Sequence, residues 1–133
     1  ETRLFPGIAE LLEQLEARNI AWGIVTNKAT RFTGRLVELL GLTERVGCVV
    51  CGDTTPHMKP HPAPLLAAAE RLRLAPAQCS YVGDDLRDIQ AAQAAGMASI
   101  AVEYGYQGTG NGGPRSWNAD AVIAQPMDLI GCL

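Results

Sequence analysis

The sequence predicts an α/β fold in which helices alternate with the strands of a doubly wound parallel sheet. The first observation is size and composition, because 133 residues, 47% of them apolar and 19% charged, suit one globular domain. The second is order, because helical patterns alternate with short apolar runs along the chain. The third is length. The apolar runs are as long as strands, and parallel strands joined by right-handed helical crossovers form such a sheet.

The first half of the chain predicts two helices and two strands. A helix is expected from Pro6 to about Arg18, followed by a buried strand over 20–26. A second helix is expected over 29–40, with Gly41 after its end, and then a strand over 46–51. Apolar residues at helical spacing are expected on the inner faces of these helices: Ile8, Leu11, Leu12, Leu15, Phe32, Leu36, Leu39 and Leu40.

The second half continues the alternation after a loop that contains Pro56, Pro60 and Pro62. The third helix is marked by apolar residues at helical spacing, and the fourth by inward residues before a closing glycine. The expected inner residues are Leu65, Leu66, Ala69 and Leu72, then Ile89, Ala92 and Ala95 before Gly96. We expect, in order, a strand over 79–83, a helix over 85–95, a strand over 98–102, a glycine-rich loop over 104–118, a strand over 121–124 and a helical turn after Pro126.

Charge and composition exclude two kinds of partner. Lys and Arg number 11 against 14 for Asp and Glu, so the net charge is −3, and no basic stripe is present. Nucleic acid is therefore not an expected partner. The apolar runs are too short to span a membrane, and the start ETRLFPG lacks the regions of a signal peptide, which favours a cytoplasmic protein. The pattern leaves the oligomeric state open.

Four cysteines raise the question of a metal site or a disulfide. Cys48 and Cys51 have the spacing of a metal-binding pair, but residues three apart on a strand point to opposite faces. Neither a second such pair nor paired histidines complete a zinc site with them. We therefore expect all four, including Cys79 and Cys132, to be reduced and buried.

Two carboxylates follow the strand that ends at Gly83. Asp84 and Asp88 are four residues apart at the start of a helix, a spacing that brings side chains to one face. Ligands of doubly wound sheets bind beyond the carboxyl ends of the strands, and Mg²⁺ prefers carboxylate oxygens. We therefore expect a Mg²⁺ site at Asp84 and Asp88. The alternative is that Asp84 or Asp85 only caps the helix.

Two other segments place polar groups at strand ends. Thr26 and Asn27, followed by Lys28, end the first strand, where a hydroxyl and free backbone N–H groups can bind phosphate oxygens. The alternative for that segment is an ordinary helix cap. Lys59 lies in a proline-stiffened loop after the second strand, so its ammonium group can be aimed. A hydroxyl, an ammonium group and paired carboxylates on one rim fit phosphoryl transfer.

Three motifs carry a family resemblance over nearly the whole chain. Val25-Thr26-Asn27, Lys59-Pro-His-Pro62 and Gly83-Asp-Asp-Leu-Arg-Asp88 resemble the second, third and fourth motifs of the haloacid dehalogenase superfamily of phosphatases, in that order. Four segments resemble the bacterial phosphoglycolate phosphatases within it: Trp22–Lys28, Gly83–Ile89, Tyr104-Gly-Tyr106 and Trp117–Asp120. The alternative is the sister group of N-acetylmuramic acid 6-phosphate phosphatases, which the same segments resemble.

The resemblance implies a Rossmann-like core and a Mg²⁺-dependent hydrolase of small phosphorylated metabolites. By it, Thr26, Asn27, Lys28 and Lys59 would bind phosphate and substrate, and Thr26 and Lys59 would be catalytic residues. Asp84 would bind Mg²⁺, with Asp88 supporting it directly or through water. An aspartate would attack phosphorus to form an aspartyl-phosphate, which water then hydrolyses.

The first motif of the superfamily, Asp-x-Asp-Gly-Thr, is absent from these 133 residues. We therefore expect residues 1–133 to be the C-terminal portion of the core domain, with the nucleophile, its strand and a substrate-selecting cap upstream of Glu1. Family strand order would place that strand between those ending at Thr26 and Gly83. The chain alone is expected to be inactive, and poorly stable unless those two strands close up or a partner fills the gap. A non-catalytic phosphate- or metal-binding module is the alternative function, and a receiver-like signalling domain fits the motif order less well.

Overall fold

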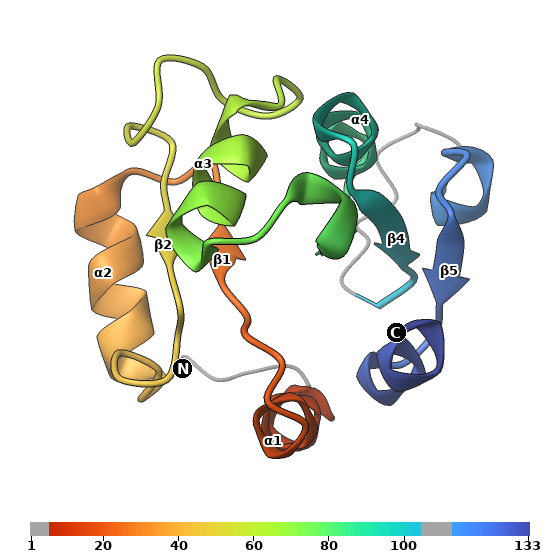
Figure 1. Cartoon of the computed structure of the whole chain (residues 1–133), viewed down its shortest axis with the longest axis horizontal. Helices are drawn as coiled ribbons and strands as arrows, with labels where there is room; N and C mark the ends of the chain where they lie inside the picture. Colours follow the sequence, from red (N-terminus) through yellow and green to blue (C-terminus); the bar gives the residue numbers. More distant parts are fainter. Residues whose placement is uncertain (1–5, 105–112) are drawn as a thin grey trace.

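The computed structural model describes residues 6–104 and 113–133 and has the expected α/β architecture. Every strand pairing within these ranges is parallel, and helices separate the strands along the chain (Figure 1). The α-helices are α1 (Ile8–Ala17), α2 (Thr30–Leu39), α3 (Ala63–Leu72) and α4 (Leu86–Ala95). The strands are β1 (Ile24–Val25), β2 (Val49–Val50), β3 (Ser80–Gly83), β4 (Ala98–Val102) and β5 (Ala121–Ile123). Short 3-10 helices are η1 (Pro76–Gln78), η2 (Pro114–Ser116) and η3 (Pro126–Cys132).

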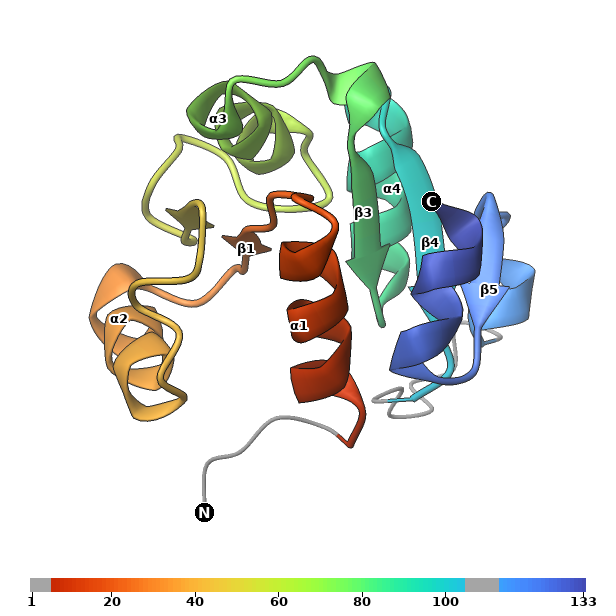
Figure 2. The same ribbon diagram turned by 60° about the horizontal axis from the view of Figure 1, so that its bottom comes forward.

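Helices cover both faces of the strands. In Figure 1, α3 and α4 lie above the strands, while α1 and η3 lie below them, and α2 lies beside β2. Figure 2 shows α1 in front of the strands and α4 behind β3. This layering is the doubly wound arrangement that the alternating pattern predicts.

The strands form two separate sheets. β1 pairs with β2, with Ile24 opposite Val49, whereas β3, β4 and β5 form a second sheet in that order. Among the described residues, β1 and β3 share no ladder. A cleft of about 680 Å³ lies there, lined by both strands and by residues of α1 and α3, and we call it the inter-sheet cleft. Six of its lining residues are Leu11, Leu12, Ile24, Leu65, Tyr81 and Val82.

Two apolar layers hold the elements together. On the face of α1 and η3, the buried core includes Leu11, Leu15, Ile100, Ile123 and Leu129. On the other face, α3 packs on α4 through small side chains, which let the two helices approach closely. The buried residues of that second layer are Leu65, Ala69, Ala91, Ala92, Ala95 and Met97.

The second helix buries a different face from the expected one. Phe32 is 55% exposed and Leu39 is 59% exposed, although both were expected on the inner side. Thr33 and Val37 are the buried residues of α2, because the helix packs only at the edge beside β2 and turns that narrow face inward. Leu66 of α3, also expected inside, is 41% exposed.

The first two strands are shorter than expected. The runs over 20–26 and 46–51 form ladders only over Ile24–Val25 and Val49–Val50. β1 has a ladder partner on one side only, so the flanking residues lack the pairing that would extend the strand. Gly41 and Gly96 follow α2 and α4 with φ of 71° and 79°, the left-handed conformation expected after a helix end.

All four cysteines are free thiols, as expected. Cys48 and Cys51 are buried, but Cys79 is only partly buried and Cys132 is exposed, so the expected burial was wrong for these two. Cys132 lies in η3 at the end of the chain, where no further element covers it. Within residues 6–104 and 113–133, no helix has the length and apolar character needed to cross a membrane. The expected loop over 104–118 lies mostly outside the described residues.

Candidate active site

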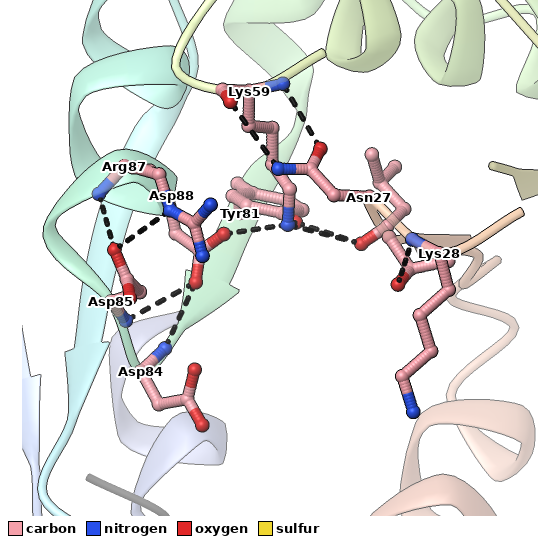
Figure 3. A network of polar contacts seen from close by, with 10 residues as sticks. Asn27, Lys28, Lys59, Tyr81, Asp84, Asp85, Arg87 and Asp88 are labelled. Carbon is pink, nitrogen blue, oxygen red and sulfur yellow. Dashed lines mark hydrogen bonds and ion pairs between the residues drawn. The ribbon is translucent and has the colours of Figure 1, made fainter. Parts of the chain in front are cut away.

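The end of β1 places Thr26 and Asn27 at the rim of the sheet. The backbone N–H of Thr26 still donates to Val50 of β2, at 2.9 Å, so the strand fixes this residue. The Thr26 hydroxyl oxygen accepts from the Lys28 N–H at 3.2 Å. Lys28 is exposed, and its ammonium group points away from the other labelled polar groups in Figure 3. Lys28 is therefore not brought into the cluster that the other predicted residues form.

The Asn27 side chain holds the loop that carries Lys59. Its amide oxygen accepts from the Lys59 N–H at 3.1 Å, and its amide nitrogen donates to the Lys59 carbonyl oxygen at 3.3 Å. The loop also approaches closely at Gly52, where a Cβ atom would overlap the carbonyl oxygen of Asn27. These contacts fix the Lys59 backbone to the end of β1.

A second tie joins this loop to the start of α2. The Asp53 carboxylate accepts from the Thr30 N–H at 3.0 Å and from the Thr30 hydroxyl at 2.6 Å. These two hydrogen bonds lower the pKa of Asp53, and the side-chain bond contributes most. The sequence did not single out Asp53, because the partner lies 23 residues away and no local spacing signals the bond.

The Lys59 ammonium group lies at the centre of the cluster. It donates to Asp88 at 2.6 Å and to the Tyr81 hydroxyl oxygen at 2.8 Å, and more weakly to the Val25 carbonyl oxygen at 3.4 Å (Figure 3). The side chains of Lys59 and Asp88 are 10% and 9% exposed, so this ion pair is almost excluded from water. A pair in such surroundings interacts more strongly than one at the surface.

Asp88 also organises the turn between β3 and α4. Its second oxygen accepts from the N–H groups of Asp84 at 3.1 Å and Asp85 at 3.2 Å. Gly83 lets this carboxylate come close, because a Cβ atom there would overlap the Asp88 side chain. Asp85 caps α4 by accepting from the Arg87 N–H at 2.9 Å. The capping role that the sequence left open for Asp84 or Asp85 therefore belongs to Asp85.

Asp84 is the carboxylate that remains available to a ligand. The donor to its side chain among the described residues is its own backbone N–H, and the side chain points away from Asp88 in Figure 3. Partial loss of hydration raises the pKa of Asp84, and the negative charge of Asp88 raises it further. A bound cation would relieve both effects, so the donor chemistry of Asp84 fits Mg²⁺. The described residues contain no cluster of three or more His, Cys, Asp or Glu side chains placed around one ion.

Tyr81 belongs to the cluster, although the sequence analysis predicted no role for it. Its hydroxyl donates to the Val25 carbonyl oxygen at 3.0 Å and accepts from Lys59, so it links β3 to β1 across the inter-sheet cleft. One available signal was a residue with a polar tip within the otherwise apolar run 79–83. His57 and His61, which were also given no role, stack on one another with ring centroids 4.2 Å apart.

The chain is similar to curated phosphatases over nearly its whole length. The chain is 46% identical to a phosphoglycolate phosphatase of Xanthomonas campestris pv. campestris, covering 97% of this chain and 58% of that protein. It is 44% identical to an N-acetylmuramic acid 6-phosphate phosphatase of Pseudomonas putida, covering 96% of this chain and 57% of that protein. The chain thus spans less than two thirds of the length of these curated relatives.

A solved structure and a family profile extend the comparison. The crystal structure of a predicted phosphoglycolate phosphatase from Haemophilus somnus superimposes with a TM-score of 0.89 at 32% identity, covering 98% of this chain and 57% of that one. The profile described as haloacid dehalogenase-like hydrolase matches residues 1–102. The match includes the segments that carry Thr26, Lys59 and Asp84. The chain belongs to the haloacid dehalogenase-like hydrolase family.

Proposed function

We propose that the protein is a Mg²⁺-dependent phosphomonoester hydrolase of small phosphorylated metabolites. The observation that carries the proposal is the water-excluded Lys59–Asp88 pair, 2.6 Å long, beside the end of β1. Thr26 and Asn27 lie at that strand end, and nothing among the described residues accepts a hydrogen bond from the Asn27 N–H. A fixed cation beside a free N–H group and a hydroxyl is suited to binding a phosphoryl group as charge develops on it.

Each residue has a distinct proposed role. The Thr26 hydroxyl and the Asn27 N–H bind phosphate oxygens, and Lys59 neutralises charge on the nucleophile and the phosphate. Lys28 helps to bind the anionic substrate from its exposed position. Asp84 binds Mg²⁺, which when bound neutralises phosphate charge, while Asp88 holds the Asp84 turn and supports the ion directly or through water.

We also propose that residues 1–133 are the C-terminal portion of a larger core domain. The inter-sheet cleft supports this, because apolar side chains of α1 and α3 line it from both layers and its two flanking strands share no ladder. A strand from an upstream segment would fill the cleft and bring an aspartate to the rim beside Lys59. The carboxylate oxygen of this aspartate attacks phosphorus and the ester P–O bond breaks, while the second aspartate of an Asp-x-Asp pair gives its proton to the leaving alcohol oxygen. Water then cleaves the aspartyl-phosphate to release phosphate and restore the aspartate.

The proposed substrate is 2-phosphoglycolate, with N-acetylmuramic acid 6-phosphate as the second candidate. Relatives named for each activity match the chain at 46% and 44% identity, so both names carry nearly equal support. We also propose a cytoplasmic location, supported by four cysteines that are all free thiols, since disulfides are rare in that compartment.

Phosphate release by the intact gene product, with each ester and with or without Mg²⁺, tests the proposal. Hydrolysis that depends on Mg²⁺ and disappears in Lys59→Met and Asp84→Asn supports it. Glu38→Gln is the matched control, because Glu38 is exposed on α2 away from the site and should leave the rate unchanged. Absence of release from either ester by the folded wild type would favour a non-catalytic phosphate- or metal-binding module.

A further inference from the structure

The Tyr81 hydroxyl accepts a hydrogen bond from Lys59. An ammonium group has no lone pair, so the Tyr81 oxygen is the acceptor in the 2.8 Å contact, and the Tyr81 proton is left for the Val25 carbonyl oxygen at 3.0 Å or the Asp88 carboxylate. The Val25 carbonyl faces away from β2, because the N–H groups of its neighbours Ile24 and Thr26 donate to β2. A carbonyl oxygen has two lone pairs, so this bond is compatible with a strand in the inter-sheet cleft.

The surroundings of Tyr81 keep the hydroxyl neutral. A phenol is uncharged at neutral pH, and burial raises the pKa of Tyr81 further. A neutral acceptor differs from the Asp88 carboxylate, because it fixes the direction of the ammonium group without cancelling its charge. Lys59 thus has one charged partner from α4 and one neutral partner from β3.

The three contacts of the ammonium group differ in length. The bonds to Asp88 and Tyr81 are 2.6 and 2.8 Å, whereas the contact to the Val25 carbonyl oxygen is 3.4 Å. An ammonium group has three N–H donors, and the longest contact is the weakest. The two short bonds therefore fix the nitrogen, and the third N–H is the one that can turn toward a substrate oxygen.

We propose that Tyr81 is a positioning residue that aims the Lys59 ammonium group at the phosphoryl site, a role that rests on the proposed function. Tyr81 acts through Lys59 and does not itself bind substrate. Removing its hydroxyl leaves Lys59 charged and paired with Asp88, but with one fewer fixed contact. The ammonium group then samples more orientations, and fewer of them suit the transition state.

The first test measures the accessibility and reactivity of the Lys59 amine without any catalytic readout. The intact gene product is treated with a trace of acetic anhydride, and mass spectrometry gives the acetylation of Lys59 relative to the exposed Lys28. In Tyr81→Phe this ratio should rise about fivefold or more, because a hydrogen bond to a charged group is lost. Ser99→Ala, which removes a buried hydroxyl from β4 that bonds Asp120 and not Lys59, should leave the ratio unchanged.

The second test measures turnover. Tyr81→Phe should lower kcat about tenfold with little change in KM, because the lost contact positions a group that acts in the transition state. 3-Fluorotyrosine at position 81 keeps the hydroxyl and shape but weakens the oxygen as an acceptor. This replacement should also raise the acetylation ratio and lower kcat. It provides the test if Tyr81→Phe does not fold.

The outcomes separate this proposal from the proposed function. An unchanged acetylation ratio in a folded Tyr81 variant overturns the positioning role. A raised ratio in Tyr81→Phe, together with a folded wild type that hydrolyses neither ester, supports the contact to Lys59 and overturns the phosphatase function instead. A rise in KM with kcat unchanged would assign Tyr81 to substrate binding and also overturn the proposal.

Discussion

The carboxylate of Asp88 joins Lys59 to the turn that carries Asp84. One oxygen accepts from the Lys59 ammonium group at 2.6 Å, and the other accepts from the Asp84 N–H at 3.1 Å. The proposed phosphate-binding cation and the proposed metal ligand therefore have their positions set by one side chain. A change at Asp88 is expected to disturb both, whereas changes at Lys59 or Asp84 leave the other in place.

Loss of Lys59 should destabilise the fold because it leaves the buried carboxylate of Asp88 without its positively charged partner. We expect Lys59→Met to lower the free energy of unfolding by about 3 kcal/mol, as for other buried pairs that lose one partner. The double variant Lys59→Met/Asp88→Asn should lose less than Lys59→Met alone. Urea denaturation measures both, and Lys28→Met, at an exposed position, is the control. Equal losses in the single and double variants would contradict a coupled pair.

Gly83 should tolerate no side chain. Gly83→Ala places a Cβ atom against the Asp88 side chain, and we expect a loss of about 2 kcal/mol, as for other overpacked sites. Gly34→Ala is the matched control, because nothing lies within 4 Å of a Cβ atom there. Gly34 lies in the middle of α2, where alanine favours the helix more than glycine does, so Gly34→Ala should stabilise the protein by about 1 kcal/mol. Two thermal melts suffice, and a neutral effect at Gly83 would be evidence against the close contact.

Asp84 should limit stability at neutral pH. Its pKa is raised in the folded state, so the stability of the fold decreases as pH rises from the ordinary carboxyl pKa through the raised one. Asp84→Asn should therefore have a higher Tm than the wild type at pH 7, and the difference should vanish in acid below the ordinary value. Mg²⁺ should raise the Tm of the wild type and not that of the variant. A lower Tm for Asp84→Asn at pH 7 would contradict the raised pKa.

Asn27 should affect turnover through the Lys59 loop. Asn27→Asp keeps the acceptor for the Lys59 N–H but loses the donor to the Lys59 carbonyl oxygen. We expect kcat to fall about tenfold or more, since small misplacements of catalytic groups are costly. Steady-state kinetics of the intact gene product measure this, with Glu38→Gln as the control. Wild-type turnover in Asn27→Asp would show that the paired bonds are dispensable.

The 133-residue chain by itself should neither hydrolyse phosphate esters nor melt cooperatively at high temperature. Its apolar inter-sheet cleft leaves side chains of α1 and α3 without a covering strand, and unfilled apolar space costs stability. Calorimetry and a phosphate assay on the pure, mass-verified chain, compared with the intact gene product, are the measurements. Mg²⁺-dependent turnover by the short chain would refute the upstream nucleophile.

Local patterns predicted most of the fold around the site. The segment from Gly83 to Gly96 has a strand end, an aspartate cap and a helix with three inward residues, and each feature depends on nearby neighbours. The structure has α4 at Leu86–Ala95 with Asp85 as its cap and Ile89, Ala92 and Ala95 buried. Predictions of this kind succeed because capping and helical periodicity act over a few residues.

Features that depend on residues far apart in the sequence could not be predicted from it. Periodicity on α2 favoured Phe32 and Leu39 as inner residues, but a helix at the edge of the molecule buries only the face that meets its neighbours. The bonds from Tyr81 to Lys59 and Val25 connect residues 22 and 56 positions apart, which no local spacing encodes. The residue types of the site could be predicted, whereas the partner of each could not.

The separation of β1 from β3 has a consequence for how the molecule opens. Each of the two sheets has its own backbone ladder, and side-chain hydrogen bonds from Tyr81 to Val25 and from Lys59 to Tyr81 and Asp88 connect one side of the cleft to the other. Backbone amides of β1 and β2 are thus expected to exchange with deuterium as one cooperative unit, and those of β3, β4 and β5 as another, slower unit. The seam between these two units runs through the residues that are proposed to handle phosphate.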